Sequence, residues 1–114
     1  MHAANRTLAW RYARALFEAA SARGAQDRVG DDLQACAQAR LQDLPALSDP
    51  RLAGAEKKRL LRESLQEHLA PLTSDFLDLL LDEKRLDLLA LAAEDFRESA
   101  REKRGVAKAR VRSA

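Results

Sequence analysis

The chain has very few of the residues that favour β-structure. It contains no isoleucine, three valines (Val29, Val106 and Val111) and two threonines, and its aromatic residues make up only 4% of 114 residues. Leu, Ala, Arg, Lys, Glu and Gln, which are strong helix formers, dominate instead. The composition therefore argues against a β-rich fold and predicts an all-α protein, and the length suits a single domain.

Residues that commonly form disulfides, bind metal ions or build phosphate-binding loops are also scarce. A single cysteine, Cys36, excludes an internal disulfide and a cysteine-based zinc site. The two histidines, His2 and His68, stand far apart, and the glycines are isolated, so the sequence has neither a metal-ligand cluster nor a phosphate-binding loop. We expect no catalytic residue, no metal, no cofactor and no small-molecule substrate, and we predict that the chain is not an enzyme.

Long apolar runs are missing as well. No uncharged stretch approaches the roughly 20 residues that a transmembrane helix needs. The N-terminus also lacks the apolar core of a signal peptide. Together with the lone cysteine, these absences predict a cytoplasmic protein.

Apolar residues recur at helical spacing along most of the chain. The pattern predicts helices over residues 5–23, 27–43, 52–69, 71–81 and 86–104, with one short turn at most between 44 and 50. Gly24 supplies the stop of the first helix, and Pro71 begins the fourth as a first-turn proline. The acidic pairs 31–32 and 94–95 are adjacent in sequence and so point to different sides of a helix, and we interpret them as solvated surface.

The last part of the chain is basic and follows another period. Residues 97–114 carry seven Lys/Arg against two Asp/Glu, whereas residues 1–96 carry 13 against 16. From 107 to 112 small apolar and basic residues alternate, which predicts a strand. Because a lone strand is not stable, we expect residues 1–105 to form a helical bundle and residues 106–114 to begin a second domain or a linker. A different reading is a small helical nucleic-acid binder that uses this basic tail, although the tail has no interleaved aromatics.

Two of the predicted helices carry more apolar surface than one core contact needs. The first has one stripe through Ala9, Ala13, Phe17 and Ala20 and another through Leu8, Tyr12, Ala15 and Ala19, and the segment after Pro71 has surplus leucine. Either the bundle buries both stripes, or the two helices leave an apolar groove for an amphipathic partner helix. The pattern alone does not decide between these readings.

Several short motifs, in order along the whole chain, resemble one known family. They are Arg-Tyr-Ala-Arg-Ala-Leu-Phe at 11–17, Asp-Pro at 49–50 followed by Glu-Lys at 56–57, Asp-Phe-Leu at 75–77, Arg-Leu at 85–86 and Val-x-Ser-Ala at 111–114. This order is similar to that of the delta subunit of F-type ATP synthases, called OSCP in mitochondria. The resemblance implies the N-terminal domain of that subunit, a six-helix bundle, without its second domain. One departure is Lys84, where the family often has glycine.

The resemblance also implies a function without catalysis. The family's delta subunit belongs to the peripheral stalk, or stator, and its N-terminal domain binds the N-terminal helix of an alpha subunit on the F1 head, so that the head resists rotor torque during ATP synthesis. The missing domain would contact the b subunits, and the complex would sit at the cytoplasmic side of the bacterial plasma membrane. The groove that is implied lies between the first and fifth helices and includes Tyr12, Ala15, Asp75 and Leu79. Helical spacing adds Leu8, Phe76 and Asp82 as neighbours, and Phe76 can also be a core residue.

Overall fold

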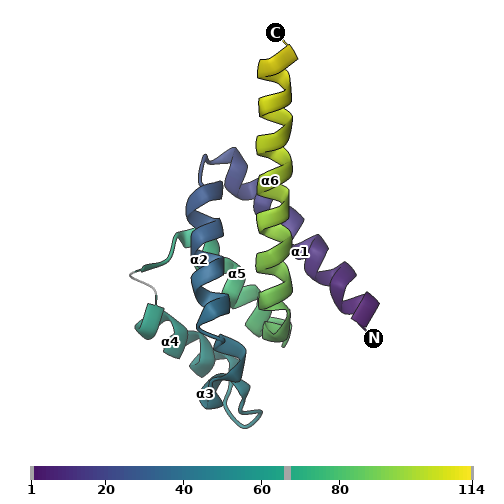
Figure 1. Ribbon diagram of the computed structural model, residues 1–114. Coiled ribbons are helices and arrows are strands. Elements are labelled where there is room, and N and C mark those ends of the chain that lie inside the picture. The colour runs from purple at the N-terminus through teal and green to yellow at the C-terminus, as the bar shows by residue number, and fades with distance from the viewer. Residues whose placement is uncertain (1, 66–67, 114) are drawn as a thin grey trace.

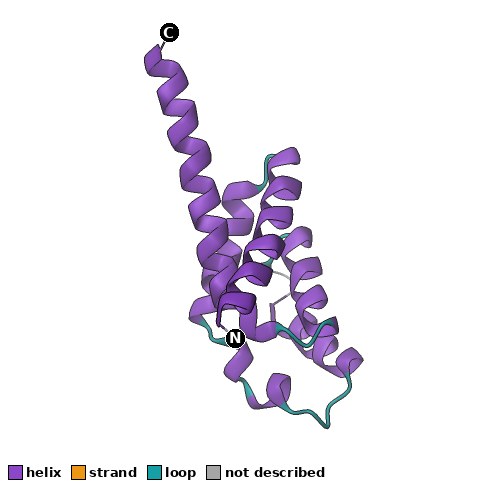
Figure 2. Ribbon diagram, turned by 90° about the vertical axis from the view of Figure 1, so that its right-hand side faces the viewer, coloured by secondary structure: helices purple, strands orange, loops and turns teal. Residues whose placement is uncertain are grey.

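The protein is described from a computed structural model that covers residues 2–65 and 68–113, with side chains for 4–65 and 68–105. These residues form only helices and the turns between them, and Figures 1 and 2 show no strand among them. The predicted all-α, six-helix class is therefore confirmed. In chain order the elements are α1 (His2–Ala22), α2 (Gln26–Gln38), the 3-10 helix η1 (Leu41–Asp43), α3 (Pro45–Ser48), α4 (Gly54–Leu65), α5 (Pro71–Asp82), the 3-10 helix η3 (Leu86–Leu88) and α6 (Leu89–Ser113).

The core lies where α1 and α2 pack on the first half of α6, and α5 closes it by packing on α1, α2 and η3. Phe17 of α1 and Phe96 of α6 meet edge to face with ring centroids 5.3 Å apart, an arrangement that aromatic pairs prefer. The Phe96 ring also fills the space beside Gly30 of α2, where an added Cβ would lie 3.3 Å from it. The small side chain at position 30 thus lets α2 approach α6 closely.

The second half of α6 extends past the rest of the bundle, as Figure 1 shows at the C-terminal end. The predicted strand over residues 107–112 is therefore wrong: residues 106–113 continue the helix. Ala, Lys and Arg are strong helix formers, and adding a residue to an existing helix costs far less than nucleating one. Gly105 does not stop the helix, because a glycine inside a helix costs only about 1 kcal/mol relative to alanine. Ala114 lies outside the described residues.

Three helices end at a residue with a left-handed backbone. They are Gly24 after α1 (φ 66°), Arg40 after α2 (φ 53°) and Lys84 after α5 (φ 56°). After α1, the N–H of Ala25 donates to the carbonyl of Ala20 at 2.8 Å. After α5, the N–H of Arg85 donates to the carbonyl of Leu80 at 2.7 Å. This Schellman pattern normally uses glycine at the left-handed position.

Two predicted helices are shorter than their periodicity indicated. The helix predicted over 27–43 ends at Gln38, because Arg40 turns left-handed and the chain restarts as η1. The helix predicted over 52–69 becomes α4, which begins at Gly54 and ends at Leu65, while residues 66–67 lie outside the described part of the chain. In both cases the apolar pattern continues through a turn, since Leu41 and Leu69 still pack on the core.

Candidate partner-binding face

Helices α1 and α5 lie next to each other and run in opposite directions. At one end, the Arg85 guanidinium donates to the side-chain oxygen of Asn5 at 2.6 Å. Further along, the Tyr12 ring meets the Phe76 ring at an angle of 75°, with centroids 6.4 Å apart. The predicted site residues stand on these two helices, and we call their shared surface (Leu8, Tyr12, Ala15, Asp75, Leu79 and Asp82, with Phe76 beneath) the α1–α5 face.

The two apolar stripes of α1 have different environments. The residues of the first stripe, Ala9, Ala13, Phe17 and Ala20, are buried in the bundle, where α6 is the main neighbour of α1. In the second stripe, Leu8, Tyr12 and Ala19 are only partly buried and Ala15 is exposed. The bundle alone therefore covers one stripe of α1 and leaves the other partly open to solvent.

Helix α5 contributes one buried and three exposed side chains to the α1–α5 face. Phe76 belongs to the core and is 5% exposed, so it forms the floor beneath Tyr12. Leu79 is 39% exposed, which is unusual for a leucine in a helix whose other leucines, Leu72 apart, are fully buried. Asp75 and Asp82 are also exposed.

The carboxylates of α5 differ in their partners. Asp82 forms an ion pair of 2.6 Å with Lys58 of α4, and Asp78 forms one of 2.9 Å with Arg62 of the same helix. The hydrogen bond from Arg62 to Asp78 raises the pKa of that guanidinium. Asp75 makes no ion pair or hydrogen bond with another described residue. The α1–α5 face therefore combines apolar side chains with an exposed carboxylate, Asp75, whose charge acts on Arg62 without a direct ion pair.

Two of the hollows on the described surface lie away from the α1–α5 face. One, of about 520 Å³, is bordered by Leu47, Leu52, Lys57, Leu81 and Leu86, where α3 and the start of α4 meet α5 and η3. The other, of about 510 Å³, lies between α2 and α6, with Gly30 and Phe96 at its base. Neither includes a residue of the α1–α5 face.

The described residues show no arrangement suited to catalysis. They contain no group of three His, Cys, Asp or Glu side chains that could hold a metal ion. The only cysteine, Cys36, is buried, and the loss of hydration together with the nearby Asp32 carboxylate raises the pKa of its thiol to about 11. Such a thiol is almost wholly protonated at neutral pH and is a poor nucleophile. None of the helices in residues 2–65 and 68–113 has the length and apolarity to span a membrane.

Comparison with known proteins decides the family. The family model described as the ATP synthase delta (OSCP) subunit matches residues 8–114, which is nearly the whole chain. The chain belongs to the ATP synthase delta (OSCP) subunit family. The delta (OSCP) subunit is a non-catalytic, structural subunit of the ATP synthase. The family confirms the resemblance found in the sequence motifs.

Individual relatives in the delta (OSCP) family are bacterial. The chain is 40% identical over 111 residues to the ATP synthase subunit delta of Carboxydothermus hydrogenoformans, covering 94% of this chain and 62% of that protein. It is 37% identical over 110 residues to that of Anoxybacillus flavithermus (94% and 61%) and 34% identical over 113 residues to that of Bordetella avium (95% and 62%). The chain thus spans about three-fifths of the length of the relatives it matches.

The prediction that both acidic residues at 31–32 are solvated is wrong for Asp32. The pair Asp31-Asp32 was expected to be solvated surface, and Asp31 is exposed, but Asp32 is buried and bonded to the start of α5. The sequence at the start of α5, where the partner Ala70 lies, could have indicated that an acidic side chain is buried there. The segment Leu69-Ala70-Pro71 begins a helix without a capping side chain of its own, so the free N–H groups there need water or a group from another part of the chain.

Proposed function

We propose that the chain acts in the peripheral stalk of an F-type ATP synthase, where its α1–α5 face binds the amphipathic N-terminal helix of an alpha subunit. The observation that carries this proposal is the second stripe of α1, with Tyr12 and Leu8 half-buried and Ala15 exposed, beside the exposed Leu79 of α5. An amphipathic helix laid along this face would cover these side chains. Membership of the delta (OSCP) family supports the choice of partner.

The mechanism that follows is tight docking without chemistry. The bundle supplies a rigid surface, since the floor residue Phe76 is held in the core. Tyr12 stands near the middle of the face and is of the residue type that contributes most at protein interfaces. Asp75 would favour an occupant with a cationic side chain at its edge, because the carboxylate is exposed and, although its charge acts on Arg62, it forms no direct ion pair with that residue. Docking of this kind would hold the catalytic head against rotor torque.

The proposal extends to the wider complex. In this role the chain is a peripheral subunit at the cytoplasmic side of the bacterial plasma membrane. The remaining two-fifths of the length of its relatives would supply the contact to the b subunits.

The experiment is a calorimetric titration of the chain with a synthetic alpha-subunit N-terminal peptide. Ala15→Asp places a charge among the apolar side chains, and we expect the affinity to fall well over tenfold, because a charge buried without a partner costs several kcal/mol. Ala35→Asp makes the same change at an exposed position of α2 and should leave the affinity unchanged. Equal affinity of the Ala15→Asp variant and the parent chain would refute the assignment of the face.

Nucleic-acid binding through the basic tail receives no support from the described contacts. Arg97 bonds to Gln34, Arg101 pairs with Glu98 at 3.1 Å, and Arg104 lies 4.0 Å from Asp27. Lys103 stands over the Phe17 ring at 5.7 Å. These four cations have partners at the bundle surface, whereas the side chains of Lys108, Arg110 and Arg112 lie outside the described residues. A gel-shift assay at low salt, the condition that favours phosphate contacts, tests this function directly.

A further inference from the structure

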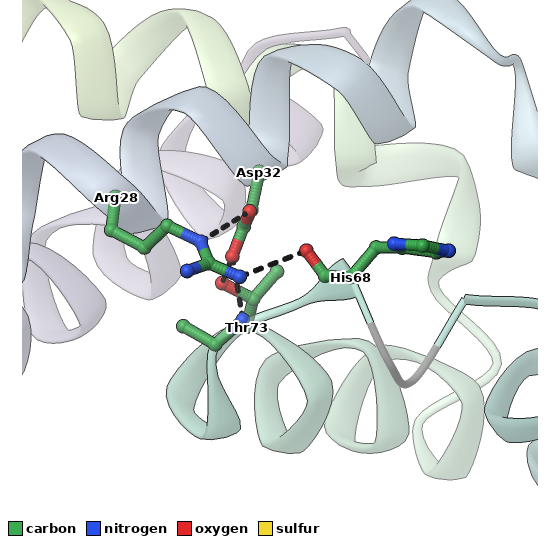
Figure 3. A network of polar contacts seen from close by, with 5 residues as sticks. Arg28, Asp32, His68 and Thr73 are labelled. Atoms are coloured by element: carbon green, nitrogen blue, oxygen red, sulfur yellow. Dashed lines mark hydrogen bonds and ion pairs between the residues drawn. The ribbon is translucent and has the colours of Figure 1, made fainter.

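The N-terminus of α5 is capped by a side chain from another helix. The residue at its cap position, Ala70, has no capping group, and Pro71 follows at the first helical position. The Asp32 carboxylate of α2 takes over this role with a single oxygen: it accepts the Ala70 N–H at 2.8 Å and the Thr73 hydroxyl at 2.8 Å. Figure 3 shows these groups converging at the start of α5.

The same carboxylate is fixed from the α2 side. Its second oxygen accepts the Arg28 Nε at 3.2 Å, and the other end of the guanidinium donates to the carbonyl of His68 at 2.9 Å. The Asp32 side chain is only 7% exposed, and Thr73 is fully buried. Charge-assisted hydrogen bonds of this kind are about twice as strong as neutral ones. They are also directional, so they restrict where α5 begins and how it is rotated relative to α2.

Apolar packing alone does not set that rotation. Helix α5 carries leucines at 72, 77, 79, 80 and 81, so several rotations about its axis would bury a leucine surface. In the observed rotation Thr73, Phe76, Leu77 and Leu80 point inward. Leu79, displaced about 60° from Phe76 around the helix, remains 39% exposed. The hydrophobic effect is non-directional, so it does not by itself select one of the rotations that bury a leucine surface.

The other polar contacts of α5 are less able to fix its rotation about the helix axis. Its ion pairs to α4, Arg62–Asp78 and Lys58–Asp82, lie at the surface, where such pairs contribute at most about 1 kcal/mol. The bond between Arg85 and Asn5 holds the far end, beyond the last turn. Among these contacts, only the one through Asp32 combines burial with two short hydrogen bonds to α5.

We infer that Asp32 is a positioning residue for the α1–α5 face: its bonds to Ala70 and Thr73 hold α5 in the rotation that keeps Leu79 and Asp75 outward. The consequence for binding rests on the proposed function, whereas the consequence for the rotation does not. A merely structural role would affect stability alone. A positioning role changes the exposure of residue 79 and the affinity of the face even where stability is retained.

The first test follows residue 79 and needs no partner. A Leu79→Cys variant in a Cys36→Ala background is labelled with a thiol reagent. Asp32→Leu with Thr73→Val is then added, which replaces both side-chain partners by apolar groups and can leave stability nearly unchanged. We expect labelling to slow by at least about threefold as residue 79 turns inward. Val29→Ala, which truncates a fully buried residue one turn earlier on α2, is the control and should not slow it.

The second test measures the alpha-subunit peptide by calorimetry with the same changes in the parent chain. We expect about a tenfold loss of affinity in the Asp32→Leu/Thr73→Val variant and no loss in Val29→Ala, under conditions where circular dichroism shows both to be folded. If the double variant does not fold, Thr73→Val carries both tests, since it keeps the size and shape of the side chain and removes the hydroxyl that donates to Asp32.

The outcomes separate the two proposals. If the parent chain does not bind the peptide, the proposed function fails, and the labelling rates alone decide the role of Asp32. If the parent binds, but labelling and affinity in the variant match those of Val29→Ala, then Asp32 only stabilises the bundle and the positioning role is refuted.

Discussion

Replacing Lys84 by glycine should stabilise the protein. Lys84 has φ 56° at the end of α5, and the left-handed backbone costs a residue with a Cβ roughly 1–2 kcal/mol that glycine does not incur. Glycine loses more backbone entropy on folding, by about 0.5–1 kcal/mol. The lysine charge at a helix C-terminus also contributes some 0.3 kcal/mol that the substitution removes. The net gain is about 0.5 kcal/mol, and it comes from the backbone because Lys84 is exposed.

Thermal and urea unfolding measure this gain. For a chain of this length we expect the Tm to rise by about 2–4 °C. Gly24 supplies the opposite control, because it holds the same position in the same hydrogen-bond pattern after α1, at φ 66° and with open space around it. Gly24→Ala should therefore lower the free energy of unfolding by about 1 kcal/mol.

The affinity for the alpha-subunit peptide shows whether Lys84→Gly changes stability alone. Lys84 stands outside the α1–α5 face, so Lys84→Gly should bind the alpha-subunit peptide as the parent does. A Lys84→Gly variant that is less stable than the parent, alongside a Gly24→Ala variant that is unchanged, would refute the assignment of backbone strain to these two positions.

Two further predictions concern single ionisable groups. The raised pKa of Cys36, about 11 against 9.0 for the free thiol, should make its alkylation at pH 8 about a hundredfold slower in the folded chain than in urea; similar rates would contradict its burial. Burial and the neighbouring Glu94 raise the pKa of Asp95 above 3.8, so the folded state binds protons more readily than the unfolded state and loses stability as pH rises through this range. Asp95→Asn should therefore raise the Tm slightly at pH 7 and leave it unchanged at pH 3, and an identical shift at both pH values would exclude this cause.

Much of the helical architecture follows from local sequence. The buried stripe of α1, from Ala9 to Ala20, appears at helical spacing in the sequence and is buried as expected. Gly24 and Pro71 mark helix boundaries because their backbones suit a left-handed turn and a first turn respectively. The residues proposed for the α1–α5 face were likewise chosen from apolar spacing and from a family resemblance, and their role in binding stays a prediction.

The sequence predictions that were wrong have physical causes. The alternation after Gly105 predicted a strand, but short alanine-rich alternation is equally compatible with a helix that is already running. Lys84 and Arg40 are left-handed although neither residue favours that conformation, because the surrounding helices fix where the chain has to turn. The buried Asp32 was missed because its partners on α5 lie 38 and 41 residues away.

The sequence by itself determined that this chain is helical, where most helices begin and end, and that α1 and α5 carry surplus apolar surface. Helical periodicity reports contacts within one or two turns, so it identifies apolar arcs on each helix. Only the tertiary structure decided which arc of α5 is buried, placing Phe76 inside and Leu79 outside. That choice depends on hydrogen bonds between residues distant in sequence, above all those of Asp32. The apolar spacing along α5 does not indicate these bonds.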